Sequence, residues 1–112
     1  MQDILKMMFE KQMEFVKSWV PLDTLDVPQR EHYSLKYLQC IMEEIIELQR
    51  EYPSRKFWHK IVKGQVDDKK ALLEFIDVLL FLVALAVING WTPEKIQDAY
   101  LEKTEFNKKR FL

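Results

Sequence analysis

Residues 71–88 read ALLEFIDVLLFLVALAVI, and sixteen of these eighteen residues are apolar. When this stretch is wound as a helix, apolar side chains cover nearly its whole circumference, which predicts a helix buried on most sides. The two exceptions, Glu74 and Asp77, are three residues apart and therefore share one face. Buried carboxylates are costly unless they are paired, hydrogen-bonded or bound to a metal. A divalent cation is the first candidate for the group that stabilises them.

Length and composition predict one soluble domain over residues 1–112, with 48 % apolar and 31 % charged residues. The net charge of −1 argues against a partner that is a nucleic acid polymer or an acidic membrane. The single cysteine, Cys40, cannot form a disulfide within the chain, and no basic leader followed by an apolar run is visible after Met1. We therefore expect a cytoplasmic protein.

The apolar stretch also invites comparison with a membrane span. At eighteen residues it is slightly shorter than the roughly 20 residues that a spanning helix needs. It also carries two carboxylates, which are expensive inside a bilayer. We therefore expect a buried helix of a soluble protein and no membrane partner.

An all-α fold is predicted, because apolar residues recur at helical spacing and no strand-like alternation is found. Asp67 or Asp68 can cap the helix that contains the organising stretch, since a short carboxylate accepts bonds from free N–H groups. Asn89-Gly90 stops that helix, and Thr92-Pro93 starts the next one. The four expected helices cover residues 2–19, 29 or 30 to about 51, 71–88 and about 93–110.

A second acidic pair lies in the sequence EEIIE at residues 43–47. Glu44 and Glu47 have the same spacing as Glu74 and Asp77, so antiparallel packing of the two helices would place four carboxylates around one point. Such a cluster of hard oxygen ligands suits Mg²⁺ and implies a phosphate-bearing substrate. Mutual repulsion without metal should raise the pKa values of these carboxylates. The alternative is that EEIIE is only a solvated helix face.

The end of the chain carries hydrogen-bond donors on one helical stripe. Tyr100, Lys103, Asn107 and Arg110 recur at helical spacing, as donors for a polyphosphate would. Basic residues late in a helix also complement the helix dipole, which is the simpler interpretation. Trp58 is either a platform for stacking on a base or a core residue, and the sequence alone favours the core.

The two acidic pairs resemble a family signature. EEIIE at 43–47, then 26 residues, then EFID at 74–77 is similar to the ExxE…ExxD pattern of the all-α NTP pyrophosphohydrolases, the MazG-like superfamily. The chain looks most like the dimeric dUTPases. RKFWHK at 55–60 is similar to their aromatic, Lys-rich segment, and YLEKTEFNKKR at 100–110 to their Tyr-xx-Lys-xxx-Asn-xx-Arg ending. Gln12 stands where that family tends to carry an early glutamine.

The resemblance implies a four-helix bundle that is completed by oligomerisation, as a homodimer or homotetramer. It also implies Mg²⁺-dependent hydrolysis of dUTP between the α and β phosphates, giving dUMP and pyrophosphate. One carboxylate would help to activate the attacking water. The implied catalytic and metal-binding residues are Glu44, Glu47, Glu74 and Asp77, and the implied substrate-binding residues are Gln12, Trp58, Tyr100, Lys103, Asn107 and Arg110.

The chain departs from the family pattern at positions that bear on the base. Phe15 and Val16 stand where an asparagine often follows the early glutamine, and Leu80 stands where the family often has histidine. A MazG-like pyrophosphatase for another nucleotide, such as dCTP, is therefore the alternative enzyme. A non-catalytic helical dimerisation module is a third hypothesis, but such a module has no use for Glu74 and Asp77.

Overall fold

The structure of the chain is a computed structural model that describes residues 3–52 and 66–111. Four α-helices make up most of this part, and it contains no strand. The prediction of an all-α fold is therefore confirmed. The elements in chain order are α1 (Ile4–Lys17), the 3-10 turn η1 (Leu22–Thr24), α2 (Val27–Gln49), α3 (Asp68–Ile88) and α4 (Pro93–Phe111).

Short polar side chains cap the first three α-helices. Asp3 accepts a hydrogen bond from the backbone of Lys6, and Asp67, rather than Asp68, caps α3 by accepting from Lys70 at 3.1 Å. At the start of α2, the side chains of Asp26 and Gln29 each accept from the other's backbone N–H, at 2.8 and 3.0 Å. This capping box explains why α2 begins at Val27, two residues before the predicted start.

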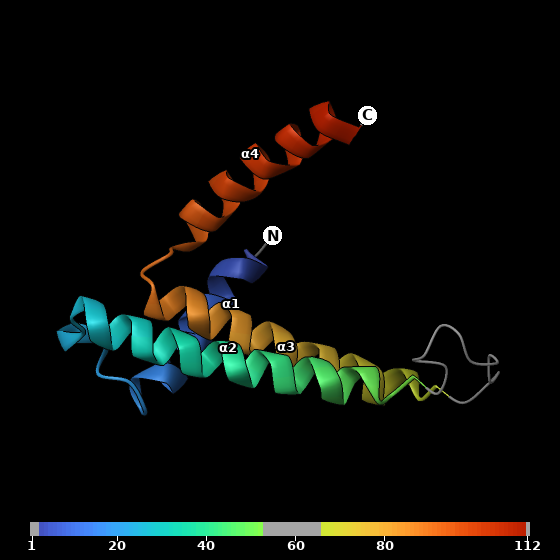
Figure 1. Cartoon of the computed structure of the whole chain (residues 1–112), viewed down its shortest axis with the longest axis horizontal. Helices are drawn as coiled ribbons and strands as arrows, with labels where there is room; N and C mark the ends of the chain where they lie inside the picture. Colours follow the sequence, from blue (N-terminus) through green and yellow to red (C-terminus); the bar gives the residue numbers. More distant parts are fainter. Residues whose placement is uncertain (1–2, 53–65, 112) are drawn as a thin grey trace.

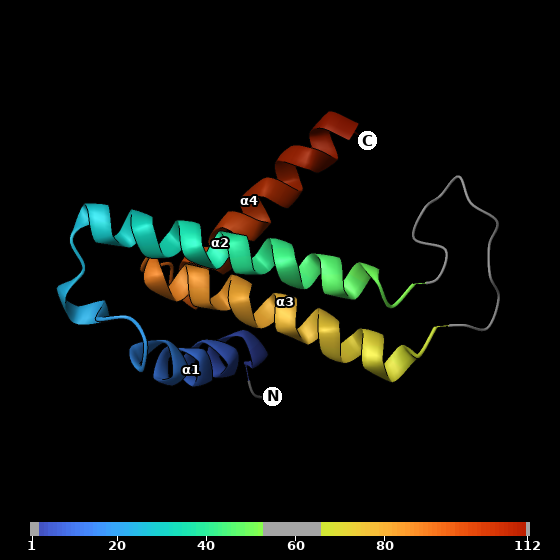
Figure 2. The same cartoon turned by 60° about the horizontal axis from the view of Figure 1, so that its bottom comes forward.

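The helices α2 and α3 lie side by side and run antiparallel, as Figure 2 shows. This confirms the arrangement on which the predicted carboxylate cluster depends. The helix α1 packs on the C-terminal half of α3, where the core lies. Buried core residues come from α1, the connector after it and the end of α3: Phe9, Val16, Val20, Val83, Ala84, Ala86, Val87 and Ile88.

The prediction that the 71–88 helix is buried on most sides is correct only for its second half. Leu72, Leu73 and Phe75 in the first half are each at least 50 % exposed, because one neighbouring helix cannot cover the whole circumference. By length and composition alone α3 is apolar enough to cross a membrane. The exposed half agrees instead with the expectation that a second chain completes the bundle.

The turn between α3 and α4 has a defined geometry. Gly90 adopts a positive φ of 70°, the Trp91 N–H donates to the Ala86 carbonyl, and the Gly90 N–H donates to the Val87 carbonyl. These two bonds form a Schellman motif, which ends α3 as Asn89-Gly90 predicted. Thr92 then caps α4 by accepting from the Lys95 N–H at 3.2 Å. From this turn α4 extends away from α2 and α3 (Figure 1).

Candidate metal centre and adjoining hollow

Carboxylates from α2 and α3 converge where the two helices face each other. Glu44, Glu74 and Asp77 each offer one oxygen, and these three oxygens lie within 4.8 Å of one another. Glu47 lies close by, because its charge contributes to raising the pKa values of both Glu44 and Glu74. The structure therefore brings three of the four predicted acids together, with the fourth, Glu47, near enough to act on them electrostatically.

Two oxygens of this group have no partner to offset their burial. Glu44 Oε2 and Glu74 Oε2 are shielded from solvent and lack a hydrogen-bond partner among the residues that the structure describes. A buried acceptor without a partner is costly, so these atoms indicate a missing donor or cation. Several carboxylate oxygens within a few ångströms form the ligand set that Mg²⁺ prefers. The residues present therefore fit a divalent cation.

The electrostatics of the group agree with this interpretation. Burial raises the pKa of Glu44 to about 7, with further contributions from the hydrogen bond to Glu47 and from the charges of Glu47, Asp77 and Glu74. The pKa of Glu74 is also raised, first by burial and then by nearby carboxylates. Both directions match the expectation from repulsion in a metal-free cluster. A bound cation would offset the repulsion and lower the pKa values of these carboxylates.

Sequence reasoning missed two residues at the edge of the group. Glu51 lies near enough to raise the pKa of Glu74, and Lys70 lowers it. Lys70 Nζ also lies 3.6 Å from Glu51 Oε2, an ion pair that joins the end of α2 to the start of α3. Helical spacing contained the signal, because Glu51 follows Glu47 by four residues and Lys70 precedes Glu74 by four.

Asp77 also lines a hollow between α3 and α1. The hollow has a volume of about 230 Å³ and is lined by Gln12, Phe15, Asp77, Leu80 and Phe81. It places the predicted base-contacting glutamine beside a predicted metal ligand. Phe15 and Leu80, which also line the hollow, are two of the positions where the sequence departs from the family pattern. The hollow therefore offers one amide, one carboxylate and otherwise apolar walls.

The other predicted substrate residues are not gathered at this place within one chain. Tyr100, Lys103, Asn107 and Arg110 are all exposed on α4, which extends away from the α2–α3 pair (Figure 1). Trp58 and the RKFWHK segment at 55–60 lie outside the described residues. The roles of these residues remain predictions.

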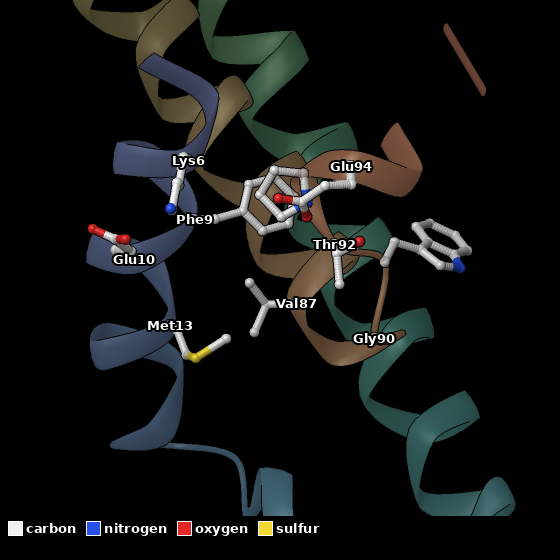
Figure 3. A pocket seen from close by; sticks show the side chains of 10 residues that line it. Lys6, Phe9, Glu10, Met13, Val87, Gly90, Thr92 and Glu94 are labelled. Carbon is white, nitrogen blue, oxygen red and sulfur yellow. The ribbon is translucent and has the colours of Figure 1, made fainter. Parts of the chain in front are cut away.

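A second pocket, of about 260 Å³, lies between α1 and the start of α4 (Figure 3). Phe9 and Met13 from α1 face Val87 and Thr92 across it, and Lys6 lies at its rim. Its lining is mostly apolar and includes none of the predicted site residues. The candidate functional site is therefore the carboxylate group with the hollow at Gln12.

Fold and site together define an all-α protein with a carboxylate centre shared by two antiparallel helices. A family model described as dUTPase matches residues 4–89. The chain therefore belongs to the all-α dimeric dUTPase family, a family of nucleotide hydrolases. This confirms the resemblance drawn from the two acidic pairs. No curated protein and no solved structure matches the chain.

The matched residues contain α1, α2 and α3, and therefore the four acids and Gln12. They end at Asn89, so α4 with its stripe lies outside them. The composition of α3, which resembles that of a membrane span, agrees with its position in this chain, where it packs against both α1 and α2.

Proposed function

We propose that the protein hydrolyses dUTP to dUMP and pyrophosphate with Mg²⁺ as its cofactor. The observation that carries the proposal is the group formed by Glu44, Glu74 and Asp77, whose oxygens lie within 4.8 Å of one another in a chain of the dUTPase family. The two buried oxygens without partners support a cation at this place. An interaction module would gain nothing from burying them.

Glu44, Glu47, Glu74 and Asp77 would hold the ion. Mg²⁺ bound there would neutralise charge on the phosphates and lower the pKa of the attacking water. Glu47 is exposed and lies outside the three-oxygen group. One of its carboxylate oxygens would bind the ion, and the other would accept the proton of that water.

The hollow beside Asp77 would bind the nucleoside. The Gln12 amide has both a donor and an acceptor, which can bind the edge of a pyrimidine. Phe15 and Phe81 offer aromatic faces against which the base can pack. The α4 donors, Lys103 and Arg110 above all, would bind the phosphates through charge-assisted hydrogen bonds.

A second candidate substrate is dCTP. Phe15 and Leu80 line the hollow where polar side chains would otherwise select the base, so the Gln12 amide is left as its main polar contact. An amide can rotate to present either its donor or its acceptor, and this weakens the discrimination between uracil and cytosine.

Pyrophosphate release from a panel of nucleotides, with and without Mg²⁺, tests the proposal. We expect dUTP to be the preferred substrate, ribonucleotides to be poor substrates, and turnover to require the metal. Glu74→Gln should abolish turnover, whereas Glu43→Gln, the same change on a neighbouring residue of α2 outside the group, should not. A preference for dCTP would select the second candidate, and no release from any nucleotide would reject the enzyme.

We further propose that the protein is a cytoplasmic homodimer or homotetramer. The exposed apolar first half of α3 supports the oligomer, since soluble monomers rarely leave such a surface uncovered. The single cysteine, Cys40, is free and half-buried, which suits a reducing compartment.

A further inference from the structure

We propose that each active site is completed by a second copy of this chain, whose α4 places Lys103, Asn107 and Arg110 beside the carboxylate group. The proposal rests on the proposed function and adds the source of the phosphate-binding residues. Within one chain the two halves of the site are separate: the carboxylates lie between α2 and α3, and the donors lie on a helix that points away from both (Figure 1).

Local hydrogen bonds keep α4 in this direction. The Schellman bonds of Gly90 and Trp91 fix the end of α3, and the Thr92 cap fixes the first turn of α4. Only a short turn separates the two sets of bonds, so little backbone is left to act as a hinge. Folding α4 back onto its own α3 would break bonds on at least one side of the turn. The same α4 can reach a second chain without any such change.

In the described part of the chain, the helix α4 packs on its own chain only near its start, where Ile96 lies against the core. None of its residues is buried, and Tyr100, Leu101 and Phe106 are each more than half exposed. The 260 Å³ pocket under its first turn separates that turn from α1 (Figure 3). Most of the stability of a helix in a protein comes from packing of its apolar face, so the exposed apolar side chains of α4 favour contact with another surface.

Charge complementarity identifies the surface that covers it. The last nine residues of α4, KTEFNKKRF, carry four basic side chains and one acid. Among the described residues, none of these basic side chains takes part in an ion pair. The facing parts of α2 and α3, with Glu51 just after α2, carry a group of acids: Glu44, Glu47, Glu51, Glu74 and Asp77.

Apolar side chains border both surfaces. Leu73 and Leu80 lie one helical turn to either side of Asp77, and Leu73 is 57 % exposed. On α4, Leu101 and Phe106 flank the donor stripe. Docking α4 of one copy on α3 of the other would therefore bury apolar surface on both chains around the charged contact.

Complementation between two inactive variants tests the proposal. One variant carries Glu74→Gln and an intact α4; the other carries Lys103→Ala with Arg110→Ala and intact carboxylates. If α4 acts on the partner, a mixed pair contains one complete site and one doubly defective site. Random mixing in equal amounts should therefore restore about a quarter of the parent activity. A mixture no more active than either variant alone would overturn the proposal.

Cross-linking tests the docking without relying on catalysis. Lys103→Cys in one preparation and Leu73→Cys in another, both with Cys40→Ala, are mixed and treated with a short bismaleimide. We expect a covalent dimer containing one chain of each kind. Lys95→Cys in place of Lys103→Cys is the matched control, because Lys95 lies in the first turn of α4, and it should cross-link far less.

The activity assay and the cross-linking distinguish a failure of the proposed function from a failure of the proposed docking. A parent protein that hydrolyses no nucleotide would reject the proposed function, while the cross-link would still report on α4. An active parent with no covalent dimer in the mixture would reject the docking of α4 on a second chain. The same conclusion would follow if Lys103→Cys and Leu73→Cys became linked only when both were in one chain.

Discussion

Replacing Glu44 by glutamine should change how the stability of the metal-free protein depends on pH. The pKa of Glu44 is raised from its ordinary 4.5 to about 7, first by burial and then by the neighbouring carboxylates. The folded chain therefore binds a proton more tightly than the unfolded chain does. The stability that the folded chain gains from protonation of Glu44 is fully present below pH 4.5 and is lost as the pH rises through about 7. Glutamine has nearly the same shape and does not titrate.

The size of the effect follows from this rise in pKa. A rise from 4.5 to about 7 corresponds to at most about 3.4 kcal/mol of stability lost between the two ends of the range. The Glu44 side chain is only half-buried, so solvent screens part of this energy. We therefore expect Glu44→Gln to match the parent below pH 4.5 and to exceed it by roughly 1–2 kcal/mol in free energy of unfolding above pH 7.

Urea unfolding followed by circular dichroism, in EDTA and at a series of pH values, measures this difference. The protein concentration must be held constant, because stability that depends on association varies with it. Glu43→Gln is the matched control, since it makes the same change one residue away and outside the carboxylate group. Its pH dependence should follow that of the parent.

Added Mg²⁺ provides a second comparison in the same assay. The ion binds the ionised carboxylates, so its stabilising effect on the parent should grow as the pH rises through about 7. Glu44→Gln should lose most of this gain. The reasoning is refuted if Glu44→Gln and the parent show the same pH dependence in EDTA, because Glu44 would then not be the group that titrates with folding.

Three further outcomes are expected. The parent should sediment as an oligomer at micromolar concentration, because the first half of α3 is exposed and apolar; a monomer there would contradict the bundle's completion by a second chain. Lys103→Ala and Arg110→Ala should each weaken triphosphate binding in calorimetry by ~1.5–3 kcal/mol, with little effect on folding, whereas Lys108→Ala, off the stripe, should bind like the parent. Asp77→Asn should melt no lower than the parent in EDTA, because it removes one repelling charge, yet it should lose nearly all turnover. It should also lose most of the stabilisation by Mg²⁺, which for the parent is roughly 2.7 kcal/mol at a hundred times the dissociation constant. A large destabilisation of Asp77→Asn in EDTA would show that Asp77 is structural.

The parts of the fold that depend on local chemistry could be predicted from the sequence. Gly90 predicted the end of α3 because a positive φ is costly for other residues, and Thr92-Pro93 predicted the start of α4. The meeting of Glu44 with Glu74 was also predictable, because two pairs at the same helical spacing face each other once the helices run antiparallel. The predicted start of α2 lies too late in the chain, because the capping box of Asp26 and Gln29 makes Asp26 the N-cap.

The parts that depend on packing between distant elements could not be predicted in the same way. Nothing in the local pattern of α4 indicates in which direction it leaves the turn, so the separation of α4 from the α2–α3 pair is visible only in the structure (Figure 1). The hollow that joins Gln12 to Asp77 depends on how α1 crosses α3, which periodicity alone does not determine. Apolar periodicity shows how much of a helix is to be covered, but it does not show whether its own chain or another covers it.

The acids in the middle of α3 also bear on how the nascent chain is sorted. Without them, residues 71–88 would be an unbroken apolar segment of eighteen residues, which is close to what the membrane-insertion machinery accepts. A carboxylate near the centre of such a segment raises the free energy of insertion by roughly 2.5–3.5 kcal/mol. Asp77 lies near the midpoint of α3, and Glu74 lies one turn before it. The residues proposed to hold the metal thus also favour release of the new chain into water, and replacing both with leucine should direct the helix to the bilayer before it can fold.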